Sequence, residues 1–362
     1  MDRFSGYKDL LNSSQYFKLV CGAGNEDTEE VNKLSFIYTL AGCKGFDVSA
    51  TPEVVKSCRD GIESAVLFSK KYWADENNLP YITVSVGMSG DHHVRKAIID
   101  PIACVNCNLC IPVCPTDAIP QSLVVIEPLC IGCGNCEAVC PPAANAISYR
   151  HNAKVLETIL PRCISAGAES IELHAGVPDD ETTIEEWKTV CASVPNGMVS
   201  MCLDRYHLTN VHLIERIKKA KLIADDRMII QADGIPMSGG KDDFNTTLQA
   251  VSCADVINKK FNMRVDKKTT KTGPGKAKLT SKRVYRPSNH KTGVYIILSG
   301  GTNALSKQLA EQCEVRCNGV AIGTYARDII EDFVSHPDFY ENFDIIKEAY
   351  LIAHELVKLN IK

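Results

Sequence analysis

The chain lacks the long apolar stretches of a membrane protein. No hydrophobic run among its 362 residues approaches the roughly 18 that are needed to cross a bilayer, and we recognise no secretory signal peptide. Aromatic residues are few, at 7%, and the formal net charge is only −4. We therefore expect a cytoplasmic globular protein in a reducing compartment, with room for one large α/β barrel or for two to three smaller domains.

Cysteine is the residue that the chain has in excess. There are 17 cysteines, an odd number that disfavours a disulfide framework. Eight of them form two copies of the pattern Cys-x2-Cys-x2-Cys-x3-Cys-Pro, at Cys104, Cys107, Cys110 and Cys114 and at Cys130, Cys133, Cys136 and Cys140. Bacterial ferredoxins with two [4Fe–4S] clusters have this spacing. Of the nine other cysteines, we expect most to be inert core thiols.

The duplicated run predicts clusters that share ligands. In such ferredoxins the fourth cysteine of each run binds the other cluster. One cluster would take the first three cysteines of the first run with Cys140, and its twin would take the first three of the second run with Cys114. Two structural zinc sites are the alternative, but four cysteines within eleven residues suit zinc poorly. The pattern therefore favours two [4Fe–4S] clusters and electron transfer.

Outside the cysteine-rich block, short apolar runs alternate with segments of helical period, which is typical of parallel βα units. Eight strand candidates fit a TIM barrel; they are residues 17–22, 45–50, 81–88, 170–176, 198–204, 228–234, 294–300 and 319–324. On the first six, one face is apolar and the other is polar. A parallel sheet covered by helices on both faces would be apolar on both, so the polar face predicts the lumen of a closed (β/α)8 barrel.

The cysteine block interrupts the barrel pattern after the third strand. We expect residues 1–97 and 151–362 to form the barrel and residues 98–150 to form an inserted ferredoxin-like α+β module at the barrel mouth, because βα loops emerge there. The apolar runs 123–126 and 146–149 are candidates for the module's small strands. A second interruption, at 263–293, is rich in Lys, Thr and Gly and predicts a flexible excursion.

Two loops late in the chain suggest a phosphate site. Gly300 and Gly301 follow the seventh strand, and Gly323 and Thr324 end the eighth. Barrels often bind phosphate with the loops after these two strands. Flavin mononucleotide would be the natural occupant beside two electron carriers, because it links one-electron and two-electron chemistry. Ordinary tight turns are the alternative.

Three polar residues are candidates for catalysis. Lys18 stands alone in an apolar strand, where it is either paired with a lumen acid such as Asp47 or Asp233 or acts as a base or anion anchor. His174, two residues after Glu172, is either acid/base machinery or a satisfied core histidine. Asp233 lies at the expected barrel mouth and could contact a ligand.

Positive charge is concentrated in one segment. Residues 259–291 hold twelve Lys/Arg and one acid, a local net charge of +11 that leaves −15 for the rest of the chain. A mobile exposed loop is the simplest interpretation, and docking on an acidic partner is the sharper one. Nucleic acid is disfavoured because only Tyr285 could supply a stacking platform.

The order of these segments resembles the light-dependent-period (LdpA) proteins of cyanobacteria and their relatives. The resemblance is carried by residues 18–25, 38–42, 46–50 and 52–55, the double cysteine run, and residues 231–239, and it thins after residue 240. It implies an iron–sulphur protein that passes the cellular redox state to a regulatory partner.

Three functions remain open after these observations. The clusters could serve a redox carrier or sensor whose state is read by a partner protein. They could instead feed a flavin or a phosphorylated substrate in the barrel of an oxidoreductase, so whether the chain is an enzyme stays open. They could also only staple the fold of a binding protein.

Overall fold

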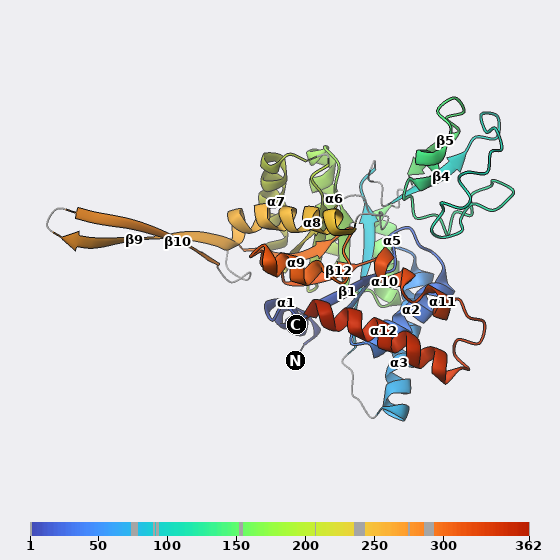
Figure 1. The fold of residues 1–362 in the computed structure, drawn as a ribbon, viewed down its shortest axis with the longest axis horizontal. Helices are drawn as coiled ribbons and strands as arrows, with labels where there is room; N and C mark the ends of the chain where they lie inside the picture. Colours follow the sequence, from blue (N-terminus) through green and yellow to red (C-terminus); the bar gives the residue numbers. More distant parts are fainter. Residues whose placement is uncertain are drawn as a thin grey trace.

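The computed structural model describes residues 2–73, 79–89, 91, 94–151, 155–206, 208–234, 243–273, 276–285 and 293–361. Eight parallel strands close into a barrel (Figure 1), so the predicted barrel is confirmed. In order around the ring they are β1 (Tyr16–Val20), β2 (Gly45–Ser49), β3 (Tyr81–Gly87), β6 (Ser170–His174), β7 (Val199–Leu203), β8 (Met228–Asp233), β11 (Tyr295–Ser299) and β12 (Gly319–Ile322).

Helices surround the barrel, and their capping residues explain where several begin. Asp27 accepts hydrogen bonds from two backbone N–H groups at the start of α2, and Pro52 occupies the first turn of α3. No helix among the described ranges is long and apolar enough to span a membrane. The helices outside the cysteine block are α1 (Arg3–Asn12), α2 (Thr28–Leu40), α3 (Pro52–Tyr72), α5 (Leu156–Ala166), α6 (Asp180–Ser193), α7 (Asn210–Ala224), α8 (Asp243–Ile257), α9 (Ser306–Gln312), α10 (Thr324–Asp328), α11 (Glu331–Val334) and α12 (Phe343–Ile361).

The core lies between the barrel and this helical layer. The predicted apolar strand faces, including Leu19, Phe46 and Leu173, are fully buried there. Helix α1 closes the lower end of the lumen with Tyr7 and Leu11, which pack among strand residues such as Tyr16. The lumen is therefore apolar at its base, and its polar residues lie above that base.

The cysteine block forms a separate module between β3 and α5. An antiparallel pair, β4 (Arg95–Ile99) and β5 (Ile147–His151), holds its two ends together, and α4 (Asn135–Val139) lies between them. The expected strand at 146–149 is thus present as β5, but the expected strand at 123–126 is wrong. That run has no regular secondary structure, and the partner of β5 is β4, whose sequence alternates less clearly.

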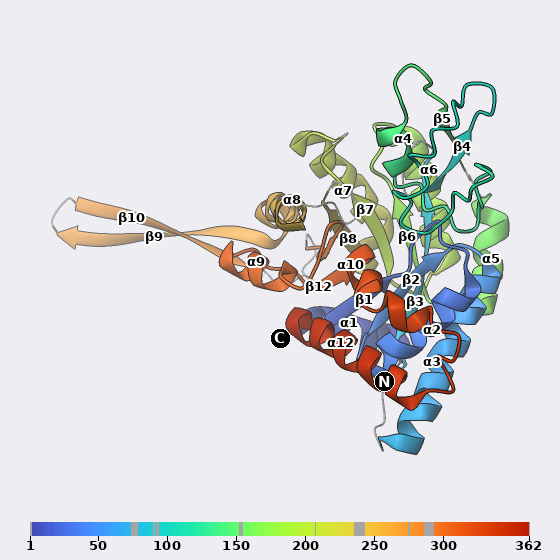
Figure 2. The same ribbon diagram turned by 45° about the vertical axis from the view of Figure 1, so that its right-hand side comes forward.

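The described residues of the basic segment form a β-ribbon, a regular element that the sequence does not predict there, and the flexibility of this excursion stays a prediction. Strands β9 (Met263–Gly273) and β10 (Lys276–Tyr285) pair antiparallel and project away from the barrel (Figures 1 and 2). Threonine and valine recur along both strands and favour extended backbone. Lysine and glycine are depleted in strands, so the composition of the segment as a whole does not predict the ribbon. Residues 274–275 and 286–292 lie outside the described part of the chain.

Candidate functional site

The eight motif cysteines line two separate cavities in the module. Each cavity combines three cysteines of one run with the fourth cysteine of the other run, which is the grouping that shared ligation requires. One cavity is lined by Cys104, Cys107, Cys110 and Cys140, and the other by Cys114, Cys130, Cys133 and Cys136. Both cavities also have apolar walls. Ile99 and Ile147 contribute to the wall of the first cavity, and Ala97 and Ile119 contribute to the wall of the second.

The chain around these cavities suits a cluster bound through sulphur. Backbone N–H groups of Ala97 and Ala118 donate to the sulphurs of Cys130 and Cys114, at 3.3 and 3.2 Å. Such bonds stabilise thiolates and tune the reduction potential of an iron–sulphur centre. Gly132 and Gly134, which flank Cys133, adopt positive φ angles of 71° and 90°. These angles let the loop curl around the second cavity.

A buried lysine ties the module to the barrel. The Lys96 ammonium, on β4, donates to three carbonyl oxygens: those of Glu127 and Cys130 within the module, both at 2.7 Å, and that of Gly24 in the barrel, at 2.5 Å. A Cβ on Gly24 would lie 3.2 Å from the Cys130 carbonyl oxygen, so the two backbones approach closely. A full positive charge is thus held beside the second cysteine cavity.

A pocket lies where the module meets the barrel mouth. Its empty space, with the open solvent at its mouth included, is about 840 Å³. The module contributes Ile131 and Cys133 to its wall. All four predicted phosphate-loop residues contribute to the barrel side: Gly300, Gly301, Gly323 and Thr324.

The first glycine loop has a geometry that only glycine can adopt. Gly300 and Gly301 both have φ of 63°. A Cβ on Gly300 would lie 1.8 Å from Asp233 Oδ1, and one on Gly301 would lie 2.2 Å from the Thr246 side chain. The loop is therefore folded tightly against β8 and α8, with its backbone at the pocket wall. Arg327 adds a cationic side chain to the same pocket.

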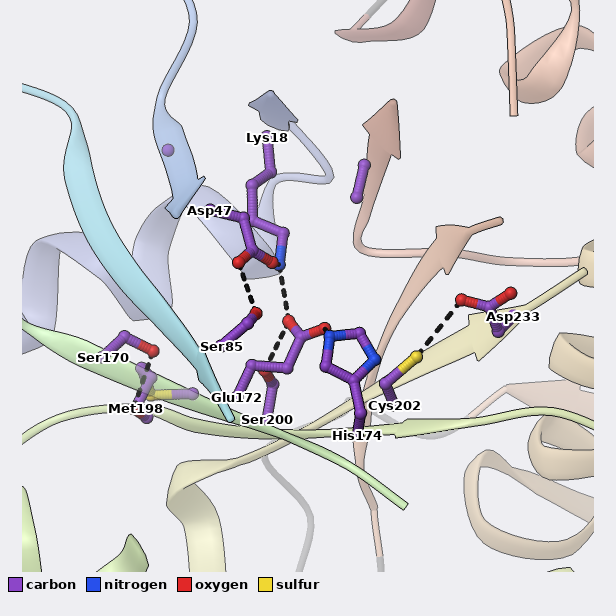
Figure 3. Close-up of polar contacts among 12 residues, drawn as sticks. Lys18, Asp47, Ser85, Ser170, Glu172, His174, Met198, Ser200, Cys202 and Asp233 are labelled. Carbon is purple, nitrogen blue, oxygen red and sulfur yellow. Dashed lines mark hydrogen bonds and ion pairs between the residues drawn. The ribbon is translucent and has the colours of Figure 1, made fainter. Parts of the chain in front are cut away.

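The floor of the pocket is a buried ion-pair network (Figure 3). The Lys18 ammonium lies 2.6 Å from both Asp47 Oδ2 and Glu172 Oε2. Ser85 donates to Asp47, and Ser200 donates to Glu172 at 3.0 Å. Of the two readings of Lys18, the paired one is observed. Its partners are Asp47, as expected, and Glu172, not Asp233.

Burial and charge shift the pKa values of this network in opposite directions. Burial alone would lower the pKa of Lys18, but Asp47 and Glu172 raise it above its usual value. Burial would raise the pKa of Asp47, but the Lys18 charge and hydrogen bond outweigh it and lower that pKa. For Glu172, burial and then the Asp47 charge dominate and raise the pKa to about 8.

The other two catalytic candidates lie at the same floor. His174 Nε2 is 3.4 Å from Glu172 Oε1, and Asp233 Oδ2 accepts a hydrogen bond from Cys202 at 3.2 Å. The structure thus brings Lys18, His174 and Asp233 together around Glu172 and Cys202. Cys202 is one of the nine cysteines outside the motif, most of which the sequence predicts to be core thiols, but its position between Met201 and Leu203 puts it on the polar face of β7. Seven of the other eight non-motif cysteines are buried, and Cys313 is exposed.

Comparison with known proteins finds a family model that matches part of the cysteine module and a relative that matches a longer part of the chain. The 4Fe-4S binding domain family matches residues 97–119. "Light dependent period A" of Synechococcus elongatus is 28% identical to the chain over 233 residues, which cover 64% of each protein. The resemblance to the LdpA family is confirmed. The chain is an iron–sulphur protein of LdpA-like sequence with a [4Fe–4S]-binding segment, and the match spans just under two thirds of the relative's length.

Solved structures were also compared with the whole chain. A 3-deoxy-D-arabino-heptulosonate 7-phosphate synthase from Thermotoga maritima aligns at a TM-score of 0.44 and 12% identity, covering 95% of this chain and 85% of its own. The YdjI aldolase from Escherichia coli K12 aligns at a TM-score of 0.46 and 8% identity, covering 99% and 96%. At this level of similarity neither bears on function.

Of the resemblance segment 231–239, residues 235–239 lie outside the described ranges.

Proposed function

We propose that this LdpA-like protein holds two [4Fe–4S] clusters and uses them in electron transfer or redox sensing, with their state read by a partner protein. The observation that carries the proposal is the grouping of the eight cysteines into two cavities that exchange their fourth ligand. Four thiolates around each cavity complete the coordination of a cubane. The chemistry supplied by the bound clusters is the uptake and release of single electrons.

The surroundings of the two cavities support a path for electrons through the module. Cys107, in the first cavity, is exposed, and apolar side chains next to the first run lie in solvent, with Ile102 94% and Val105 62% exposed. Exposed apolar residues gathered at one place are typical of a protein–protein contact. Cys133, in the second cavity, lines the barrel pocket. Electrons would therefore pass between a partner at the first cavity and the pocket side of the second.

A second candidate function is an oxidoreductase, favoured by the composition of that pocket. It joins Cys133 to the four predicted phosphate-loop residues and to Arg327 in one cavity. The glycine loop and Arg327 would hold the phosphate of flavin mononucleotide or of a phosphorylated substrate. Flavin would supply the exchange between one-electron and two-electron chemistry. The Lys18 ammonium, held between Asp47 and Glu172, would keep the floor charged and ordered beneath it.

Quantitation of iron, acid-labile sulphide and flavin on anaerobically purified protein tests both functions. We expect about eight irons and about eight sulphides per chain, as two cubanes require. Flavin released in proportion to protein would support the oxidoreductase, and reducible clusters without flavin would support the carrier or sensor. Protein with zinc and no sulphide in the cysteine cavities would rule out both.

The proposal also predicts a role for the buried charge of Lys96. We expect Lys96→Met to lower the reduction potential of the cluster proposed for the second cavity, because a nearby cation favours the more negative, reduced state. A unit charge about 10 Å away contributes roughly 1.7 kcal/mol at an effective dielectric constant of about 20, or ~70 mV per electron. Potentiometric titration followed by electron paramagnetic resonance measures the shift.

The matched control for this experiment is Lys70→Met, an exposed lysine in the last turn of α3. It removes the same charge at the far end of the helix, about 27 Å along the axis from Pro52 at the barrel mouth, and should leave both potentials in place. An unchanged potential in Lys96→Met, with full iron content, would contradict the electrostatic role.

A further inference from the structure

Three metal-ligating side chains meet at the pocket floor, outside the cysteine module. Glu172 and His174 come from β6 and Cys202 from β7, and one ligand atom from each lies within 4.8 Å of the other two. His174 and Cys202 are register partners on adjacent strands, and Glu172 precedes His174 by two residues, so all three point to the lumen (Figure 3). All three are buried. A carboxylate, an imidazole and a thiol are the common ligands of Zn²⁺ in proteins.

One distance within this group matches that between two ligands of a single ion. Two nitrogen or oxygen ligands of a tetrahedral Zn²⁺ lie about 3.3 Å apart, and Glu172 Oε1 and His174 Nε2 are 3.4 Å apart. The Cys202 thiol donates to Asp233 Oδ2 at 3.2 Å, so Asp233 lies next to the group without belonging to it.

The carboxylate of Glu172 offers one oxygen to each of two neighbours. The Lys18 ammonium contacts Glu172 Oε2, and Glu172 Oε1 faces His174 Nε2. A cation bound at Oε1 would therefore not displace Lys18, and it would offset part of the cost of burying this carboxylate.

A neighbouring amide points the same way. Gln231 on β8 is the register partner of Cys202, and its side chain is buried. Among the described residues, neither polar atom of its amide has a hydrogen-bond partner. A buried amide without partners calls for a polar group such as a water or an ion-bound ligand in the lumen.

We propose that Glu172, His174 and Cys202 form a site for one divalent transition metal ion, for which Zn²⁺ is the best match. Binding would displace the Cys202 thiol proton to solvent and leave His174 neutral. The inference goes beyond the proposed electron transfer and does not depend on it. Because Glu172, His174 and Asp233 also line the pocket, a coordination position would open toward it. That position fits an oxygen donor of a small anionic ligand.

The test is metal content of the whole protein, purified anaerobically, equilibrated with micromolar Zn²⁺ and desalted. We expect about one zinc per chain, in addition to the iron that accompanies sulphide. Zinc X-ray absorption should show one sulphur neighbour at about 2.3 Å, with nitrogen and oxygen completing the shell. His174→Ala and Cys202→Ala should each lower zinc occupancy at least tenfold while iron and sulphide stay at the wild-type level.

The matched control is Cys253→Ala. Cys253 is also buried, but its thiol lies in the layer between barrel and helices and donates to the Leu203 carbonyl. The Cys253→Ala protein should therefore keep its zinc. Absence of stoichiometric zinc in the wild type would overturn the inference, as would zinc that survives in both lumen variants. Zinc with four sulphur neighbours would overturn it too, because that ion would occupy a cysteine cavity; sulphide content then shows separately whether the cluster proposal stands.

Discussion

Replacing Cys114 with serine should remove one cluster and leave its neighbour in place. Cys114 belongs to the first cysteine run, but it lines the second cavity together with Cys130, Cys133 and Cys136. Without its thiolate, the cubane in that cavity loses a ligand, whereas the first cavity keeps all four of its cysteines. We expect iron and sulphide to fall by about half. Electron paramagnetic resonance of the reduced protein should show one set of cluster signals and no coupling between two.

The reciprocal variant and a thiol control make this result specific. Cys140→Ser should remove the other cluster, because Cys140 lines the first cavity. Cys313→Ser changes an exposed cysteine outside the module and should leave iron content unchanged. Loss of the first-cavity cluster in Cys114→Ser would show that each run keeps its own fourth cysteine.

The barrel could be predicted because its strands carry two independent signals. Alternation of polar and apolar residues, as in Lys18 with Leu19 and Asp47 with Val48, identified strands with one face in a lumen. The spacing of eight such strands then indicated closure. The same alternation located Lys18, His174 and Asp233 on the lumen side, where the structure places them around one network.

Contacts between distant segments could not be read in the same way. That β4 pairs with β5 depends on how the cysteine loops fold between them. The partner of Lys18 was left open between Asp47 and Asp233, because strand order and register bring Glu172 into reach only after closure. Cys202 was assigned by residue type rather than by its position in the alternation, which is why the group of Glu172, His174 and Cys202 emerged only from the structure.

Lys18→Met should destabilise the protein strongly. The substitution keeps most of the side-chain volume but leaves Asp47 and Glu172 buried without the ammonium that both contact. Removing one partner of a buried ion pair costs about 3–5 kcal/mol, because the remaining charge stays desolvated. In a thermal unfolding experiment at pH 8 we expect the midpoint to fall by about 5–10 °C.

Two further variants show whether that loss comes from the uncompensated charge. Lys188→Met removes an exposed ion pair with Glu185 and should change the unfolding free energy by less than about 1 kcal/mol. Adding Asp47→Asn and Glu172→Gln to Lys18→Met neutralises the stranded carboxylates, so this triple variant should recover a large part of the lost stability. A Lys18→Met protein as stable as Lys188→Met, or a triple variant no more stable than Lys18→Met, would mean that the lumen tolerates unpaired carboxylates. Water would then have to reach Asp47 and Glu172 through the pocket above them.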